Sequence, residues 1–93
     1  MNEILLNKQK QHFKMKAHHL KPVIMIGVKG LTEPVHKELE IAVNVHELIK
    51  VKVLEHDKDD IKLMAETLVK KHKAHHVQTM GHTITLYRKR KDD

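Results

Sequence analysis

Two glycines three positions apart, with a lysine between them, form the stretch of this sequence best suited to chemistry. Gly27-Val28-Lys29-Gly30 follows a short apolar segment, Val23–Ile26, and precedes Thr32 and Glu33, which begin an amphipathic pattern. Glycines have no Cβ, so backbone N–H groups can face outward. The start of a helix adds unpaired N–H groups and the positive end of its dipole. The chemistry that this stretch predicts is the binding of a phosphate group.

The loop pattern alone leaves an alternative open, a tight strand–helix turn in which one or both glycines need a positive φ. It is not a P-loop, because no Gly-Lys-Ser/Thr follows. Nor is it a dinucleotide fingerprint, which needs a third glycine and a downstream acid. The phosphate-binding interpretation therefore depends on the charges around the loop.

Positive charge is concentrated near the N-terminus. The chain has 18 Lys+Arg against 12 Asp+Glu, a net charge of +6 with histidine neutral, and five lysines but no acid lie between Asn7 and Pro22. A small basic protein most often meets nucleic acid, less often an acidic protein or an anionic lipid. A helix face without internal ion pairs favours partner binding more than an ordinary helix face does, and a merely solvated face stays open as the alternative. The cations that we assign to one binding surface with the loop are Lys8, Lys10, Lys14, Lys16, Lys21, Lys50, Lys52 and Arg88.

Aromatic residues are scarce, which limits the mode of nucleic-acid binding. Phe13 and Tyr87 are the only two, and there is no tryptophan. Proteins that read single strands stack bases on exposed aromatic rings. If this chain binds RNA, we expect it to hold phosphates and overall shape.

Several function classes find little support in the composition. There is no cysteine, so a disulfide, a thiolate metal site and a thiol nucleophile are excluded, and there is no serine. His72, His75 and His76 lie close together but lack the defined spacing with carboxylates typical of a metal site. Asp57, Asp59 and Asp60 crowd one turn without a paired acid elsewhere. We expect no enzyme, no metal, no cofactor and no small-molecule substrate.

The location follows from what the hydropathy pattern lacks. No run of about eighteen apolar residues is present, so we expect no membrane span. The first six residues are too short and lack the basic start of a signal peptide. A cytoplasmic monomer is the default expectation.

The first half of the chain predicts a helix, a strand and a second helix. Asn7 is a suitable N-cap for a helix over about 8–19, which Lys21-Pro22 ends. Val23–Ile26 is a continuous apolar run, the pattern of a strand buried on both faces. Thr32 or Glu33 then caps a helix that places one apolar face on the sheet. Four methionines are expected to fill gaps in the core: Met15, Met25, Met64 and Met80.

The second half predicts a strand, a helix and a hairpin. Leu48–Glu55 alternates, with Ile49, Val51 and Val53 on one side and Lys50 and Lys52 on the other. A helix follows the acidic turn at 56–60 and ends near 71–73, with a core-facing stripe made of Ile61, Met64, Ala65, Leu68 and Val69. Strands over 77–80 and 83–89 flank the turn Gly81-His82.

The fold class is therefore a single-domain α/β sandwich over residues 1–93 with the order α-β-α-β-α-β-β. The first two strands, joined through a helix, should be parallel with a right-handed crossover. We expect the helices to cover one face of a four-stranded mixed sheet, with the first helix near the loop.

Three linked motifs resemble the CRM domain (chloroplast RNA splicing and ribosome maturation), and in particular its bacterial stand-alone, YhbY-like members. They are residues 21–27, residues 30–33 and residues 46–53, and the similarity continues through 77–81 and 84–88 to cover about residues 7–89. The resemblance implies a sheet related to the C-terminal domain of bacterial translation initiation factor 3. It also implies RNA binding, association with precursors of the large ribosomal subunit, and a G-x-x-G loop at the binding surface. Onto this chain it carries Gly27, Val28, Lys29 and Gly30.

Three rival functions remain open from the residues. The chain could bind an acidic protein, or it could bind nucleic acid generally, duplex DNA included, without a ribosomal role. An enzyme acting on phosphorylated substrates would need an acid near the loop, and Glu33 is the nearest in sequence but suits a helix start.

Overall fold

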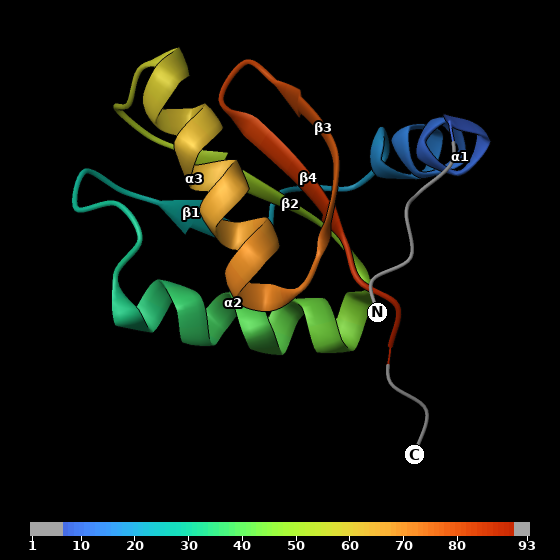
Figure 1. The fold of residues 1–93 in the computed structure, drawn as a ribbon, viewed down its shortest axis with the longest axis horizontal. Coiled ribbons are helices and arrows are strands. Elements are labelled where there is room, and N and C mark those ends of the chain that lie inside the picture. Colours follow the sequence, from blue (N-terminus) through green and yellow to red (C-terminus); the bar gives the residue numbers. More distant parts are fainter. Residues whose placement is uncertain (1–6, 91–93) are drawn as a thin grey trace.

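The computed structural model describes residues 7–90 as three helices and a four-stranded sheet (Figure 1). The order α-β-α-β-α-β-β is the one predicted, and β3 begins two residues earlier than expected. No helix in the described part of the chain is long and apolar enough to cross a bilayer. The elements are α1 (Asn7–Ala17), β1 (Ile24–Ile26), α2 (Glu33–His46), β2 (Leu48–Val53), α3 (Lys58–His72), β3 (His75–Met80) and β4 (Thr83–Tyr87).

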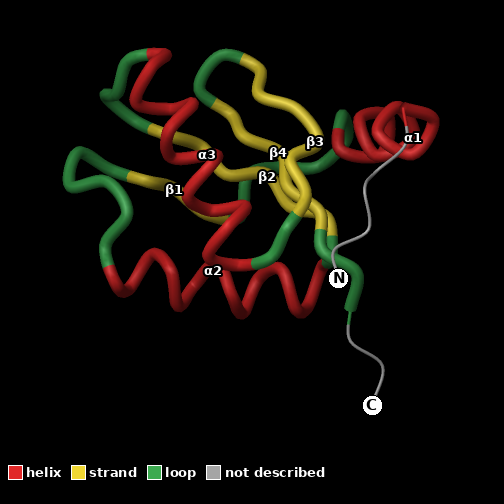
Figure 2. Tube along the Cα trace, in the orientation of Figure 1, coloured by secondary structure: helices red, strands yellow, loops and turns green. Residues whose placement is uncertain are grey.

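The strands lie in the order β1-β2-β4-β3, so β2 and β4 are central and β1 and β3 form the edges (Figure 2). β1 pairs parallel with β2, with Ile24 opposite Val51, as a strand–helix–strand unit requires. β4 runs antiparallel to both β2 and β3. The turn between β3 and β4 contains Gly81, whose φ of +57° suits glycine and confirms the hairpin.

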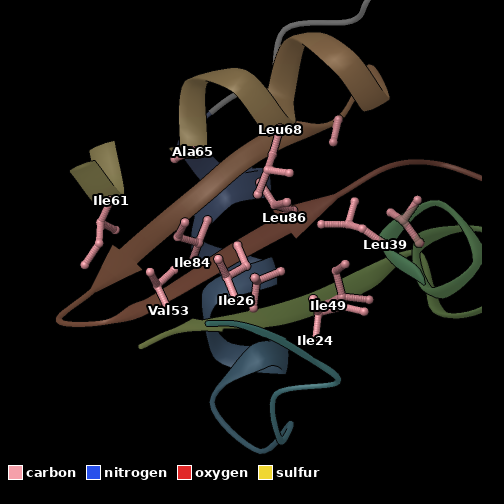
Figure 3. Close-up of a cluster of buried hydrophobic side chains, with 13 residues drawn as sticks. Ile24, Ile26, Leu39, Ile49, Val53, Ile61, Ala65, Leu68, Ile84 and Leu86 are labelled. Atoms are coloured by element: carbon pink, nitrogen blue, oxygen red, sulfur yellow. The ribbon is translucent and has the colours of Figure 1, made fainter. Parts of the chain in front are cut away.

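The main core lies between one face of the sheet and helices α2 and α3. The alternation along β2 places Ile49, Val51 and Val53 on this face, all of them at most 1% exposed. Figure 3 shows Ile61, Ala65 and Leu68 of α3 packed over the strands. The predicted stripe along α3 is therefore confirmed, since its apolar positions recur every three or four residues and fall on one side.

Helix α1 covers the opposite face of the sheet. Ala17 is buried there with Leu48 and Val77, and the rings of Phe13 and Tyr87 stack with centroids 4.1 Å apart. The expectation that the three helices share one face, with α1 near the glycine loop, is wrong. In Figure 1, α1 lies at the right end of the molecule and the loop after β1 at the left end. Helices α2 and α3 already fill the first face, so α1 covers a second, smaller apolar patch.

β1 is not buried on both faces, which corrects a second expectation. Ile24 and Ile26 point into the core, but Val23 and Met25 on the other side are 48% and 57% exposed. The reason is that β1 is an edge strand and α1 reaches only the far end of the sheet. Met15 and Met80 are exposed as well, so Met64 is the only one of the four methionines that packs against the core.

Replacing Phe13 should loosen α1 from the sheet. Phe13→Ala removes a stacked ring and half-buried apolar area, and we expect a loss of about 2 kcal/mol in the free energy of unfolding. Urea denaturation measures this loss. Met15→Ala on the same helix is the matched control, because Met15 is 73% exposed and should cost less than about 0.5 kcal/mol. Equal costs for the two variants would show that the Phe13–Tyr87 stack does not hold α1.

Candidate nucleic-acid interface

The glycine loop is a tight turn that projects from the end of β1. The Gly30 amide donates a hydrogen bond to the Gly27 carbonyl at 3.0 Å, which reverses the chain at Val28 and Lys29. Gly30 has φ +74°, and a Cβ there would lie an ordinary 3.6 Å from Met64. Its dihedral angle, rather than lack of space, requires glycine. Gly27 does not share this left-handed conformation.

The tip of this turn presents unsatisfied donors to solvent. Within residues 7–90, the amides of Val28 and Lys29 donate to no protein acceptor, and both side chains are exposed. Two adjacent amides beside a lysine ammonium can bind one anionic oxygen group. The apolar side chain of Val28, 65% exposed, stands beside them.

Helix α2 adds less to this donor set than a helix start usually does. Thr32 is the N-cap, and its hydroxyl accepts from the Val35 amide at 3.4 Å. Pro34 has no N–H, so Glu33 supplies the remaining first-turn amide and places a carboxylate beside it. The expected contribution of several helix N–H groups therefore shrinks to one.

His56, in the segment between β2 and α3, fixes the loop, and sequence analysis missed it. Its Nε2 lies 3.0 Å from the Gly27 carbonyl oxygen, which can only accept, so Nε2 carries the hydrogen. Its Nδ1 lies 3.7 Å from a carboxylate oxygen of Asp60. The sequence could have predicted this contact. β1 and β2 are parallel, so the segments that follow them must meet at the same edge of the sheet.

The sheet face that carries α1 is uncovered over its other half, and we call this half the open sheet face. One cross-strand row runs through all four strands, with Met25 opposite Lys52, Lys52 opposite Thr83 and Thr83 opposite Met80. The next row, with Lys50 opposite Thr85 and Thr85 opposite Gln78, is less open, since Thr85 is 1% exposed. The predicted outward direction of Lys50 and Lys52 is confirmed, since Lys52 is exposed and Lys50 half-buried while their neighbours in β2 are buried.

The predicted lysines form a band along this face rather than one cluster. Lys52 pairs with Met25, two residues before the loop, and Lys50 continues toward α1. Lys16 and Lys21 border a hollow of about 560 Å³ beside Phe13 and Tyr87. Lys8 is exposed at the start of α1, and Lys10 and Lys14 are half-buried on the side toward His76. Burial first, and the charges of these last two lysines second, lower the pKa of His76.

Arg88 does not belong to this band, which corrects its assignment to the binding surface. Its side chain is 13% exposed, and its guanidinium forms a two-point ion pair with Glu40, with nitrogen–oxygen distances of 3.1 and 2.8 Å. It also donates to the backbone oxygen of His72 and to the side chain of Asn44. These bonds tie the segment after β4 to α2 and α3, so the role of Arg88 is structural.

Glu40 joins Arg88 to a buried pair of histidines. His72 Nδ1 donates to Glu40 at 2.9 Å, and His72 Nε2 lies 2.9 Å from His36 Nδ1. Hydrogen bonds from Arg88 and His72 lower the pKa of Glu40 to about 2. Burial, followed by the positive charge of Lys71, lowers the pKa of His36. The four side chains resemble a proton relay in composition, but each already has a protein partner.

Fold and surface together define a small α/β module with an exposed glycine loop and a basic sheet face. The sequence matches the CRS1 / YhbY (CRM) domain over residues 5–88. It is 52% identical over 84 residues to an RNA-binding protein of Haemophilus influenzae, covering 90% of this chain and 85% of that protein. It is 40% identical over 90 residues to the probable RNA-binding protein YqeI of Bacillus subtilis, covering 97% and 94%.

A solved structure shares the fold. The solution structure of the hypothetical protein SAV1595 from Staphylococcus aureus superposes with a TM-score of 0.85 at 37% identity, covering 97% of this chain and 94% of that one. The chain belongs to the CRS1 / YhbY (CRM) domain family.

The lowered pKa of His36 predicts how stability depends on pH. A lowered pKa of His36 in the folded state means that the unfolded chain binds more protons below pH 6.5. The free energy of unfolding should therefore fall between pH 7 and 5, and His36→Gln should make this fall shallower. Glu40 does not affect the profile between pH 7 and 5. The stability that its ionised carboxylate contributes is lost only as the pH falls from its ordinary pKa of 4.5 to about 2.

Urea denaturation at half-unit pH intervals measures these profiles. Above pH 7.5 the two proteins serve as their own control, since both profiles should run parallel there. Parallel profiles from pH 7 to 5 as well would remove His36 from this role.

Proposed function

We propose that this protein binds structured RNA through its phosphate backbone and acts by binding rather than by catalysis. The observation that carries the proposal is the band of lysines on one face. It begins at the amide-lined turn around Lys29, continues through Lys52 and Lys50, and ends at the lysines of α1. The glycine loop and α1 lie at opposite ends of the molecule (Figure 1), whose largest dimension is 33 Å, and the lysines of β2 lie between them in the sheet order. Such a surface can contact several successive phosphates.

The two aromatic residues support backbone recognition over base stacking. Phe13 and Tyr87 stack on each other at an interplanar angle of 23° and hold α1 on the sheet. Each ring therefore turns one face to the other, whereas base-stacking readers present open aromatic faces to nucleotides.

A ribosomal target is the finer part of the proposal. It rests on the family to which the chain belongs and on relatives named as RNA-binding proteins. We propose that the RNA is that of the precursor large ribosomal subunit, that the protein assists assembly of that subunit, and that it works in the cytoplasm as a monomer.

Reversing the charge at the loop should weaken RNA binding without unfolding the protein. Lys29→Glu places a carboxylate beside the two free amides, and we expect roughly a tenfold loss of affinity. The plot of log affinity against log salt concentration should also become less steep, by the amount expected for the loss of about one phosphate contact. Fluorescence anisotropy with a transcribed domain of large-subunit ribosomal RNA, at several salt concentrations, measures both effects.

The matched control is Lys37→Glu. It makes the same charge change at an exposed side chain of α2, on the other side of the sheet from the proposed surface. It should keep at least half of the wild-type affinity. Lys52→Glu tests the middle of the band and should resemble Lys29→Glu. Wild-type affinity in Lys29→Glu with an unchanged melting temperature would remove the loop from the site.

The ribosomal target has its own test. Crosslinking in cells followed by sequencing of the attached RNA should enrich large-subunit ribosomal RNA and its precursors, and the protein should sediment with immature large subunits. Crosslinks spread over messenger RNAs without this enrichment would contradict the ribosomal role while leaving RNA binding intact. Competition by duplex DNA at matched salt separates an RNA-binding protein from a general nucleic-acid binder.

A further inference from the structure

A groove runs between helix α3 and the edge strand β3, on the other side of the sheet from Lys50 and Lys52. It encloses about 690 Å³. Its α3 wall is one helical stripe, because the lining positions 58, 61, 62, 65, 66, 69 and 70 recur every three or four residues. Ile61, Ala65 and Val69 form an apolar floor, and the small side chain of Ala65 leaves room in the middle.

The other wall of the groove is an open sheet edge. β3 pairs only with β4, so one side of its backbone has no strand partner within the described residues. A register shift between His76 and Gln78 interrupts regular pairing there, and the stretch Gln78–Met80 after it is regular. Unpaired N–H and C=O groups along an edge are a template for an additional strand. His76 and Thr79 line the same wall, joined by a 2.7 Å hydrogen bond.

Charge around the groove selects the kind of strand that would fit. Lys58, Lys62 and Lys70 stand along the α3 wall against a single acid, Glu66. Lys10 and Lys14 of α1 add their charges near His76 on the other wall. An occupant should therefore carry negative charge on one side and apolar side chains on the other, which is the alternation of an extended peptide.

We propose that the α3–β3 groove binds an extended acidic peptide segment of a protein partner, which adds a strand to β3 and inserts alternate apolar side chains over Ala65. Strand addition needs an exposed sheet edge for main-chain hydrogen bonds and pockets for alternate side chains, and the groove offers the edge of β3 and an apolar floor. A phosphate backbone suits the groove less well, because it has no apolar groups to cover the floor. The groove and the open sheet face lie on opposite sides of the sheet, so a peptide in the groove leaves Lys50, Lys52 and the glycine loop accessible to RNA, and the two surfaces approach each other only at Lys10 and Lys14 near His76.

The probe is a synthetic peptide, acetyl-Asp-Val-Glu-Ile-Asp-Val-Glu-Ile-amide, titrated into isotope-labelled protein and followed by amide NMR shifts. We expect saturable shifts along β3 and α3, none at Gly27–Gly30, and slower amide exchange in β3. The same peptide with lysine in place of the acids should bind at least tenfold more weakly. Absence of saturable binding by the acidic peptide at millimolar concentration would overturn the proposal, as would equal binding of the two peptides.

Matched variants separate the groove from general charge effects and from the RNA surface. Lys62→Glu/Lys70→Glu should lower peptide affinity at least tenfold and leave RNA affinity within twofold. The control Lys37→Glu/Lys71→Glu makes the same total charge change at exposed sites outside the groove and should leave the peptide affinity within twofold. Equal weakening of peptide binding by both double variants would overturn the proposal. RNA that shifts the signals of the groove and displaces the bound peptide would also overturn it. Lys29→Glu should bind the peptide normally, so the two proposals fail separately.

Discussion

The alternation along β2 is the constraint on which the rest of the structure depends. β2 is central and pairs with β1 and β4, so its register orients three strands at once. Ile49, Val51 and Val53 enter the core, and Lys50 and Lys52 must then face the other side. A slip of one residue would exchange the two sets and bury lysines without partners, which costs far more than the fold could absorb. The basic face is thus held in place by the same contacts that stabilise the core.

The candidate interface is what the helices leave uncovered. Helices α2 and α3 fill one face of the sheet, while α1, with only 11 residues, covers one end of the other. The remainder stays open between α1 and the glycine loop. In the loop, the amides of Gly30 and Thr32 form the hydrogen bonds that close the turn, and the Thr32 hydroxyl caps α2. The amides of Val28 and Lys29 form none within the described residues, so they remain for a ligand.

Arg88 and Lys29 carry the same formal charge but have different roles, because their surroundings differ. Arg88 is enclosed by Glu40, the backbone oxygen of His72 and Asn44, so its charge joins α2, α3 and the segment after β4. Lys29 stands at an exposed turn with no acid bonded to it in the described residues. Net charge pointed to a nucleic-acid ligand but could not separate these roles. The partner of each cation decides whether its charge is available outside the molecule.

The sequence alone determined the order of the elements, the alternation of β2, the apolar stripe of α3, the hairpin at Gly81 and the family resemblance. These features depend on local periodicity and turn chemistry, which a few neighbouring residues specify. Only the tertiary structure decided which face α1 covers, that β1 is half exposed, and that Arg88 pairs with Glu40. It alone revealed the His36–His72 pair and the α3–β3 groove. The His36–His72 contact spans 36 positions of the sequence, and the Arg88–Glu40 contact spans 48. No local pattern encodes which distant side chains will meet once the core has closed.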